Sequence, residues 1–125
     1  MRALSLRPDF ALDILTGKKT TEYRSWNTNH RGDLLICSTA RKMKGTIPGH
    51  ALIVCEIAEV VEMSPKHYAW KLKNFRTIKP FEVKGQQGFF NVDDDKIEIV
   101  EEYVSSLSEN DALKWVDEYI TPIMI

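Results

Sequence analysis

The octapeptide Gly17-Lys18-Lys19-Thr20-Thr21-Glu22-Tyr23-Arg24 is the most informative stretch of the chain. Two lysines, one glutamate and one arginine follow a glycine here, and charges this dense are rare in a protein core. The β-branched and aromatic residues from Thr20 to Arg24 predict a strand in which Glu22 and Arg24 share one face. Lys19 is out of phase with that face, so we expect it in the turn before the strand. From there Lys19, Glu22 and Arg24 would meet in one cleft.

The segment before the octapeptide predicts a short helix over Pro8–Thr16. Proline suits a first helical position, and the apolar residues repeat at the spacing of a helix face. Gly17 would end the helix, because a residue without a Cβ can take the left-handed conformation of a C-cap. The fold is therefore expected to place a helix directly ahead of the charged strand.

Length and composition predict one globular domain over residues 1–125. The chain is 43% hydrophobic and 28% charged, which is an ordinary globular composition. It has no apolar run near the ~20 residues of a membrane helix and no apolar signal segment, so we expect a cytoplasmic protein without a membrane partner. Cys37 and Cys55 lie in apolar runs, which favours buried thiols over a disulfide.

Charge is strongly segregated along the sequence. Residues 1–90 hold 15 Lys and Arg against 8 Asp and Glu, which gives +7, and residues 91–125 hold 2 against 10, which gives −8. A basic body predicts a polyanionic partner such as RNA, although an acidic tail folded back onto the body would satisfy the same charges. Both alternatives stay open at this point.

The remaining chain reads mostly as strands. Apolar or alternating segments predict strands at 3–6, 34–39, 51–61, 74–83 and 89–92, with Pro80 favouring a sheet edge. The nearly continuous apolar run of 34–39 predicts a central strand that is covered on both faces until Ser38. Ser64-Pro65 predicts a helix to about Leu72, and 40–49 is expected to be an exposed, mobile basic connection. Asp93–Asp95 fits either a helix cap or a turn, and Ser108 with Asp111 predicts the start of a final helix. We expect an α+β fold, with a small mixed barrel over about 3–92 and an acidic helical extension over about 93–125.

Three motifs together resemble the ASCH domain family of the PUA-like superfamily. They are Leu4-Ser5-Leu6-Arg7-Pro8, the pattern Gly17-x-Lys19-x-x-Glu22-x-Arg24, and Arg31-Gly32-Asp33-Leu34-Leu35-Ile36, with a further similar stretch over 80–90. The resemblance implies a PUA-like β-barrel with helices across its openings and a cleft at the motif lysine, glutamate and arginine. It also implies RNA or a modified nucleoside as the ligand, since relatives include RNA-binding proteins, ribonucleases and N4-acetylcytidine amidohydrolases.

The candidate catalytic residues are Lys19 and Glu22. Lys19 could activate water or stabilise an oxyanion, or the two side chains could form a structural ion pair with Arg24. This chain departs from the acetylcytidine-hydrolysing branch that it resembles. In that branch the position of Glu22 is a threonine that serves as the nucleophile. The further glutamate of that branch has no counterpart in 65–72. Hydrolysis and simple binding therefore both stay open, as does a regulatory module whose cleft is covered by the acidic tail.

Four residues are candidates for substrate binding. Arg24 suits a bidentate grip on a phosphate or a base edge, and Trp26 could stack on a base or lie at the edge of the core. Arg31 could contact a phosphate or flank a turn, and Ser38 is expected to emerge into the cleft. His30 and His67 lack companions at metal-ligand spacing, so we expect neither metal nor cofactor.

Overall fold

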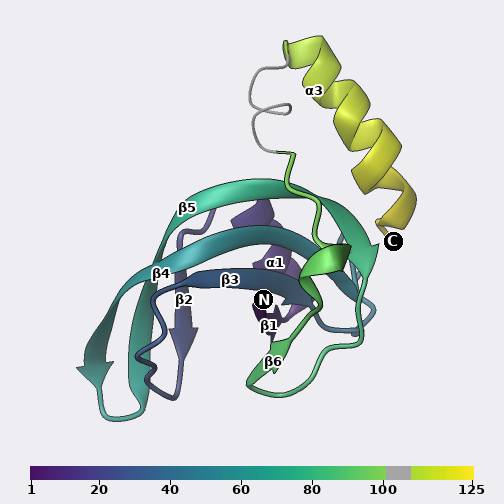
Figure 1. Cartoon of the computed structure of the whole chain (residues 1–125). Helices are drawn as coiled ribbons and strands as arrows, with labels where there is room; N and C mark the ends of the chain where they lie inside the picture. The colour runs from purple at the N-terminus through teal and green to yellow at the C-terminus, as the bar shows by residue number, and fades with distance from the viewer. Residues whose placement is uncertain (101–107) are drawn as a thin grey trace.

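A six-stranded sheet forms the body of the protein in the computed structural model, which describes residues 1–100 and 108–125 (Figure 1). Its strands follow the order β2-β5-β4-β3-β1-β6. Their bounds are β1 Arg2–Leu6, β2 Thr21–Arg24, β3 Asp33–Ser38, β4 His50–Ser64, β5 His67–Glu82 and β6 Phe89–Asn91. The helical elements are α1 Pro8–Leu15, the short turn η1 Asp94–Lys96, and α3 Glu109–Trp115, which continues through η2 Val116–Ile120 and η3 Thr121–Ile123. The α+β prediction is confirmed, including the C-terminal helix.

The sheet is strongly curved but is not closed by backbone pairing. The long strands β4 and β5 pair with four register shifts, and such bulges bend and twist a sheet. Figure 1 shows both strands arching over the shorter ones. Within the described residues β2 and β6 are the two ends of the sheet and do not pair, so the predicted closed barrel is not confirmed. Side chains bring these ends together instead, because the rings of Trp26 and Phe89 lie 5.0 Å apart.

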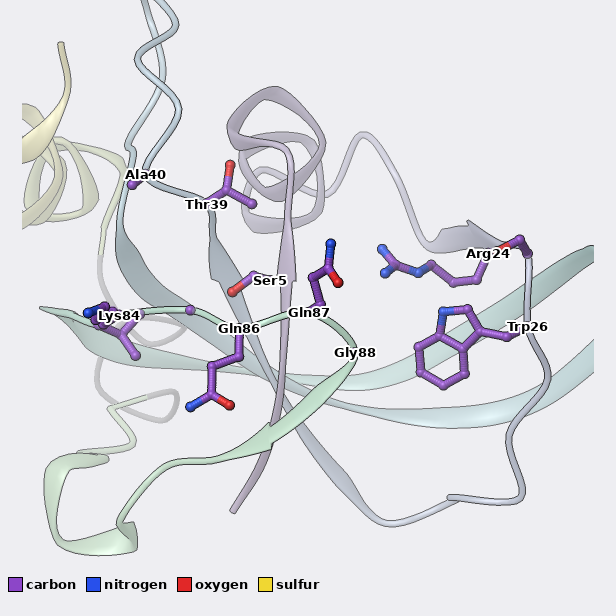
Figure 2. Close-up of a pocket in the computed structure, with 12 residues that line it drawn as sticks. Ser5, Arg24, Trp26, Thr39, Ala40, Lys84, Gln86, Gln87 and Gly88 are labelled. Atoms are coloured by element: carbon purple, nitrogen blue, oxygen red, sulfur yellow. The ribbon is translucent and has the colours of Figure 1, made fainter.

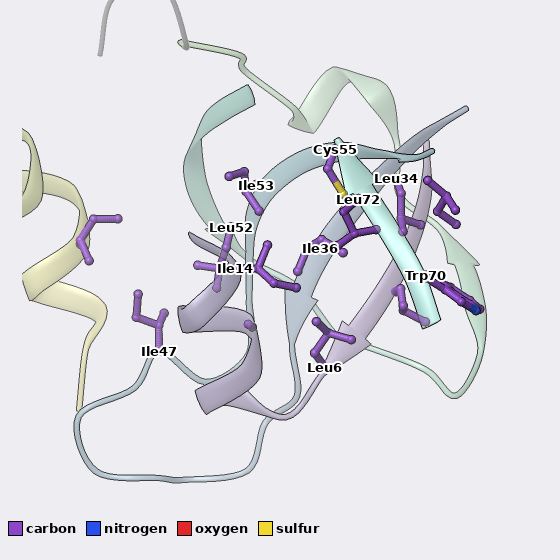
Figure 3. Close-up of a cluster of buried hydrophobic side chains, with 14 residues drawn as sticks. Leu6, Ile14, Leu34, Ile36, Ile47, Leu52, Ile53, Cys55, Trp70 and Leu72 are labelled. Carbon is purple, nitrogen blue, oxygen red and sulfur yellow. The ribbon is translucent and has the colours of Figure 1, made fainter. Parts of the chain in front are cut away.

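The core lies on both faces of β3. Leu34 and Ile36 face one cluster, which includes the inner side of α1, whereas Leu35 and Cys37 face a second. Figure 3 shows the first cluster filling the space between α1 and the curved strands. The continuous apolar run of this strand is explained by its double burial, as expected from the sequence.

The segment that leads into the charged strand folds as predicted. α1 ends at Leu15 with Thr16 as its C-cap, and Gly17 follows with a φ of +81°, the left-handed conformation. The next residues form a turn in which the backbone amide of Lys19 donates to the carbonyl of Asp13 over 3.0 Å. Lys19 therefore precedes β2 and is free of the strand alternation, which confirms the expected turn.

The helix predicted over 65–72 is wrong. Ser64 and His67 pair as the ends of β4 and β5, so Pro65 and Lys66 form a two-residue hairpin turn. Lys66 has a φ of 62°, and a proline followed by a positive φ is the pattern of a type II turn. Trp70 then lies in the core as a strand residue.

Three other segments refine the sequence interpretation. The 40–49 connection is not wholly exposed, because Thr46 and Ile47 are buried. Asp93 caps only the short 3-10 helix η1, by accepting from the amide of Asp95, and Ile99 then makes a bridge to Ile78. A longer helix from this cap would run into residues 101–107, which lie outside the described residues. Ser108 caps α3 by accepting from the amide of Asp111, as predicted. No helix in the described ranges is long and apolar enough to cross a membrane.

Candidate functional site

Lys19, Glu22 and Arg24 meet around a single carboxylate. The Lys19 ammonium lies 2.8 Å from Glu22 Oε1, and Arg24 Nη1 lies 3.6 Å from Glu22 Oε2. Glu22 Oε1 also accepts from the backbone amide of Tyr23 over 3.2 Å. The predicted convergence of the three charged groups is confirmed, and their sum is one net positive charge.

Glu22 is the buried member of this group. Only 3% of the residue is exposed, whereas Lys19 and Arg24 are both partly exposed. Lys19 leaves the carboxylate toward α1, where its ammonium lies 4.2 Å from the centre of the Phe10 ring. Arg24 leaves it in another direction, toward the indole of Trp26. Glu22 therefore holds two cations, one that lies against Phe10 of α1 and one that lies near Trp26.

A cavity of about 790 Å³ lies beside this group, and we call it the central cavity. The polar and aromatic side chains among the residues that line it are Ser5, Arg24, Ser25, Trp26, Thr39, Lys84, Gln86 and Gln87. In Figure 2 Arg24 and Trp26 enter from one side, toward Gln87 and Gly88, and Lys84 lies at the opposite end. Lys19 and Glu22 do not line the cavity, and of the motif triad only Arg24 reaches it. The prediction that all three side chains meet in one cleft is therefore not confirmed, because the carboxylate on which they converge is buried beside the cavity.

Trp26 is held in place by a cluster of aromatic rings. Its ring packs edge-on against Trp70 and Phe89, with centroids 4.7 Å and 5.0 Å away. The buried Trp70 also donates its indole N–H to the carbonyl of Trp26 over 3.3 Å. Trp26 therefore packs at the edge of the core and also lines the cavity, and its stacking on a base stays a prediction.

Sequence reasoning did not name the residues that form the other wall. In β1 Ser5 alternates with buried Leu4 and Leu6, and its hydroxyl is buried without a hydrogen-bond partner among the described residues. Gly85 approaches it so closely that an added Cβ would lie 2.2 Å from Ser5 Oγ. The signal was the glycine-bounded Gly85–Gly88 stretch, since glycine allows such a backbone approach.

Arg31 and Ser38 do not line the central cavity. Arg31 is exposed, and its guanidinium donates to the carbonyls of Thr28 and His30 in its own loop. Ser38 does not emerge into a cleft as expected, because it is fully buried and its hydroxyl exchanges hydrogen bonds with the backbone of His50. The Ser38 side chain therefore links the end of β3 to the start of β4 by hydrogen bonds.

The cysteines and histidines form no metal site in the described part of the chain. Cys37 and Cys55 are buried free thiols, and burial raises the pKa of each to about 12. His30 instead bonds to the carbonyl of Asp33 and packs against Phe89. Cys37, Cys55 and His30 thus pack within the fold, and none of the three lines the central cavity.

Comparison with known families accounts for this arrangement of motif and fold. A family model described as the ASCH domain matches residues 4–109. The chain belongs to the ASCH domain family. The match begins within β1 and ends at the first residue of α3, so the sequence resemblance is confirmed over most of the chain. No curated protein matches this ASCH domain.

Solved structures with the same fold come from Zymomonas mobilis. The crystal structure of an ASCH protein from that organism is 17% identical, with a TM-score of 0.58, and the match covers 86% of this chain and 95% of that chain. Crystal structures of two point mutants of that protein are 19% and 16% identical, with TM-scores of 0.55 and 0.57. These matches cover 86% of this chain, and 98% and 96% of the two mutant chains. At this identity the comparison establishes the fold.

Proposed function

We propose that this ASCH domain binds RNA or a modified nucleoside by holding one base in the central cavity. The observation that carries the proposal is that a planar guanidinium and an indole lie together at one mouth of the cavity. Arg24 Cζ is 5.8 Å from the centre of the Trp26 ring. Aromatic and guanidinium planes are the surfaces on which proteins stack unpaired bases. The volume of about 790 Å³ lies within the usual range of small-molecule sites.

The opposite wall supplies hydrogen-bonding groups for a base edge. The amides of Gln86 and Gln87 offer both donors and acceptors, and the Ser5 hydroxyl has no hydrogen-bond partner among the described residues. Lys84 adds a positive charge at the far end of the cavity. Such a set reads the edge of a base while the aromatic side holds its face, and the net charge of +7 over residues 1–90 favours an anionic strand.

Lys19 and Glu22 have a positioning role in this proposal. Glu22 anchors Arg24, and Lys19 completes the neutralisation of the buried carboxylate. Neither side chain lines the central cavity, so neither would contact a base that is bound there. A hydrolase is the alternative function, in which Lys19 stabilises a developing charge and Glu22 activates water.

Binding titrations with cavity variants test the proposal. We expect Trp26→Leu and Arg24→Met each to weaken binding of N4-acetylcytidine, cytidine or a short single-stranded RNA by about tenfold or more, since a stacked base contributes roughly 1–3 kcal/mol. Isothermal titration calorimetry gives the affinities, and circular dichroism checks folding. Arg31→Met is the matched control, because it removes an exposed arginine that does not line the cavity.

The same titrations separate the alternatives. Unchanged affinity in both cavity variants would contradict base binding at this site. Equal losses in Arg24→Met and Arg31→Met would point to general charge attraction instead. A product assay on every ligand that binds completes the test, because turnover that is lost in Lys19→Ala while binding persists would establish the hydrolase.

A further inference from the structure

Among the smaller hollows that adjoin the central cavity, two lie at its opposite ends, and the proposed function uses neither of them. We propose that the three together form a continuous track for a single-stranded nucleic acid of several nucleotides. This inference rests on the proposed function of the central cavity. It goes further in identifying the ligand as a strand rather than a free nucleoside, and in assigning phosphate contacts to Lys42 and Lys66.

The first hollow lies at the turn between β4 and β5, and we call it the hairpin hollow. Its volume is about 520 Å³, and it shares Arg24 and Ser25 with the central cavity. Tyr23 and Tyr68 line it, and Tyr23 is 60% exposed. An exposed aromatic ring beside a hollow of this size is a surface on which a second base can stack.

Lys66 supplies the positive charge of the hairpin hollow. Lys66 is the second residue of the two-residue turn and has a positive φ. The backbone of the turn therefore fixes the position of Lys66 at the rim of the hollow. The residue is exposed and its ammonium is available to a phosphate. The hollow thus repeats the combination of an aromatic ring and a cation found in the central cavity.

The second hollow lies at the other end, and we call it the loop hollow. Its volume is about 500 Å³, and it shares Ala40, Val83 and Lys84 with the central cavity. Lys42 from the basic connection lines it, together with His50 and the carboxylate of Glu82. Two lysines against one carboxylate leave the loop hollow with a net positive charge.

The positions of the cations argue for a strand. Each boundary between neighbouring hollows carries one cation, Arg24 at the hairpin side and Lys84 at the loop side. In a single strand successive bases alternate with phosphates, so bases in the three hollows would place phosphates near these boundaries. A free nucleoside would use only the central cavity and would leave the outer cations Lys42 and Lys66 without a role.

A length series measures the track directly. Cytidine 5′-monophosphate, a cytidine trinucleotide and a cytidine pentanucleotide are titrated into the full chain, with the matching deoxycytidine series alongside. We expect affinity to rise by about tenfold or more from the mononucleotide to the pentanucleotide, because an added stacked base and added phosphate contacts each contribute. The double variant Lys42→Ala with Lys66→Ala should abolish that gain and leave mononucleotide binding unchanged.

Salt dependence supplies a second readout. For single strands each phosphate contact contributes about 0.7 to the slope of log affinity against log salt concentration, so losing two contacts should reduce the slope by about 1.4. Lys18→Ala with Lys73→Ala is the control of equal charge, because these exposed lysines line none of the three hollows. A gain in both sugar series supports a track read through phosphates, and a gain in the ribose series alone supports one that also uses the 2′-hydroxyl.

Two outcomes would overturn the track. One is a pentanucleotide that binds no more tightly than the mononucleotide while Arg24→Met still abolishes binding, which leaves the central cavity as a nucleoside site. The other is an equal loss of affinity for the pentanucleotide in the control variant Lys18→Ala with Lys73→Ala. That result would mean that Lys42 and Lys66 act only through general charge attraction. Loss of all binding at the central cavity is a different result, because it contradicts the proposed function itself.

Discussion

Glu22 is the residue on which the geometry of the motif depends. Its carboxylate is buried, accepts from Lys19 and from a backbone amide, and lies 3.6 Å from Arg24. A buried carboxylate needs such partners, because transferring an unpaired charge from water into a protein is costly. A lysine, a glutamate and an arginine at this spacing therefore form a small ion-pair network. Arg24 is the member of the network that lines the central cavity.

Removing the charge of Glu22 should destabilise the protein and disturb the site together. In Glu22→Gln the amide keeps the shape and an acceptor but leaves two cations without a counter-charge, so we expect the free energy of unfolding to fall by about 2 kcal/mol. Urea denaturation measures the loss, and Glu59→Gln on the exposed part of β4 is the control. Wild-type stability in Glu22→Gln would contradict a structural role for the network.

The two buried cysteines give a prediction on pH. Burial raises the pKa of Cys37 and Cys55 from the ordinary 9.0 to about 12. Below about pH 9 the thiols are protonated in both the folded and the unfolded chain, so they cause no change in stability with pH. Between pH 9 and 12 the unfolded thiols lose protons that the folded ones keep, and the free energy of unfolding must fall.

Thiol labelling and denaturation at alkaline pH check this statement. The native protein should not react with a thiol reagent at pH 8, and both cysteines should react after unfolding in urea. Stability should decline above pH 9 less steeply in Cys37→Ala with Cys55→Ala than in the wild type. Rapid labelling of the native chain would show that the thiols are accessible.

At the scale of elements, the hairpin turn shows how local signals compete. Ser64-Pro65 begins helices and also begins type II turns, and the cap signal alone favoured the helix. The deciding pattern was downstream, where Trp70 and Leu72 are buried and Lys71 and Lys73 are exposed, which is the alternation of a strand. In the proposed track this turn places Lys66 at the hairpin hollow.

The connection from 40 to 49 is the second element whose role differs from its composition. Its charged residues are exposed, but Ile47 is fully buried and packs in the core cluster with Ile120. Backbone hydrogen bonds between Gly45, Thr46 and Ile125 add a second attachment. A loop anchored at two points holds Lys42 in place beside the loop hollow.

Truncation of the buried anchor tests this view of the connection. Ile47→Ala should lower the free energy of unfolding by about 3 kcal/mol, within the range for removing a buried aliphatic side chain. Lys44→Ala in the same connection should change it by less than about 0.5 kcal/mol, because that side chain is exposed. Thermal and urea unfolding of both variants provide the comparison, and equal stability would mean that Ile47 is not an anchor.

At the scale of the whole molecule, part of the acidic tail neutralises the body away from the cavity. Lys79 on β5 lies 3.1 Å from Glu98, and its hydrogen bond with this carboxylate raises the pKa of the lysine. The backbone of Glu98 also accepts from the amide of Lys79. No described residue of the tail lines the central cavity, so the alternative in which the tail covers the cleft is not observed there.

Local patterns in the sequence predicted the helix before the motif, the doubly buried β3 and the convergence on Glu22. Each of these depends on neighbours within a few residues, where spacing determines geometry. The far wall of the cavity could not be predicted, because Ser5 and Gly85 are 80 residues apart in the sequence and come close together in the fold. Ser38 was misplaced for the same reason, since its partner His50 comes from another strand.

The most direct test of base binding in the central cavity is the indole N–H spectrum of the isotope-labelled protein during titration with cytidine 5′-monophosphate and the cytidine pentanucleotide. The chain has three tryptophans, and Trp26→Leu identifies the resonance of the one that lines the cavity. We predict that the Trp26 resonance shifts progressively and saturates, while that of Trp115, which does not line the cavity, stays fixed. Saturable binding that leaves the Trp26 resonance unchanged would contradict the account.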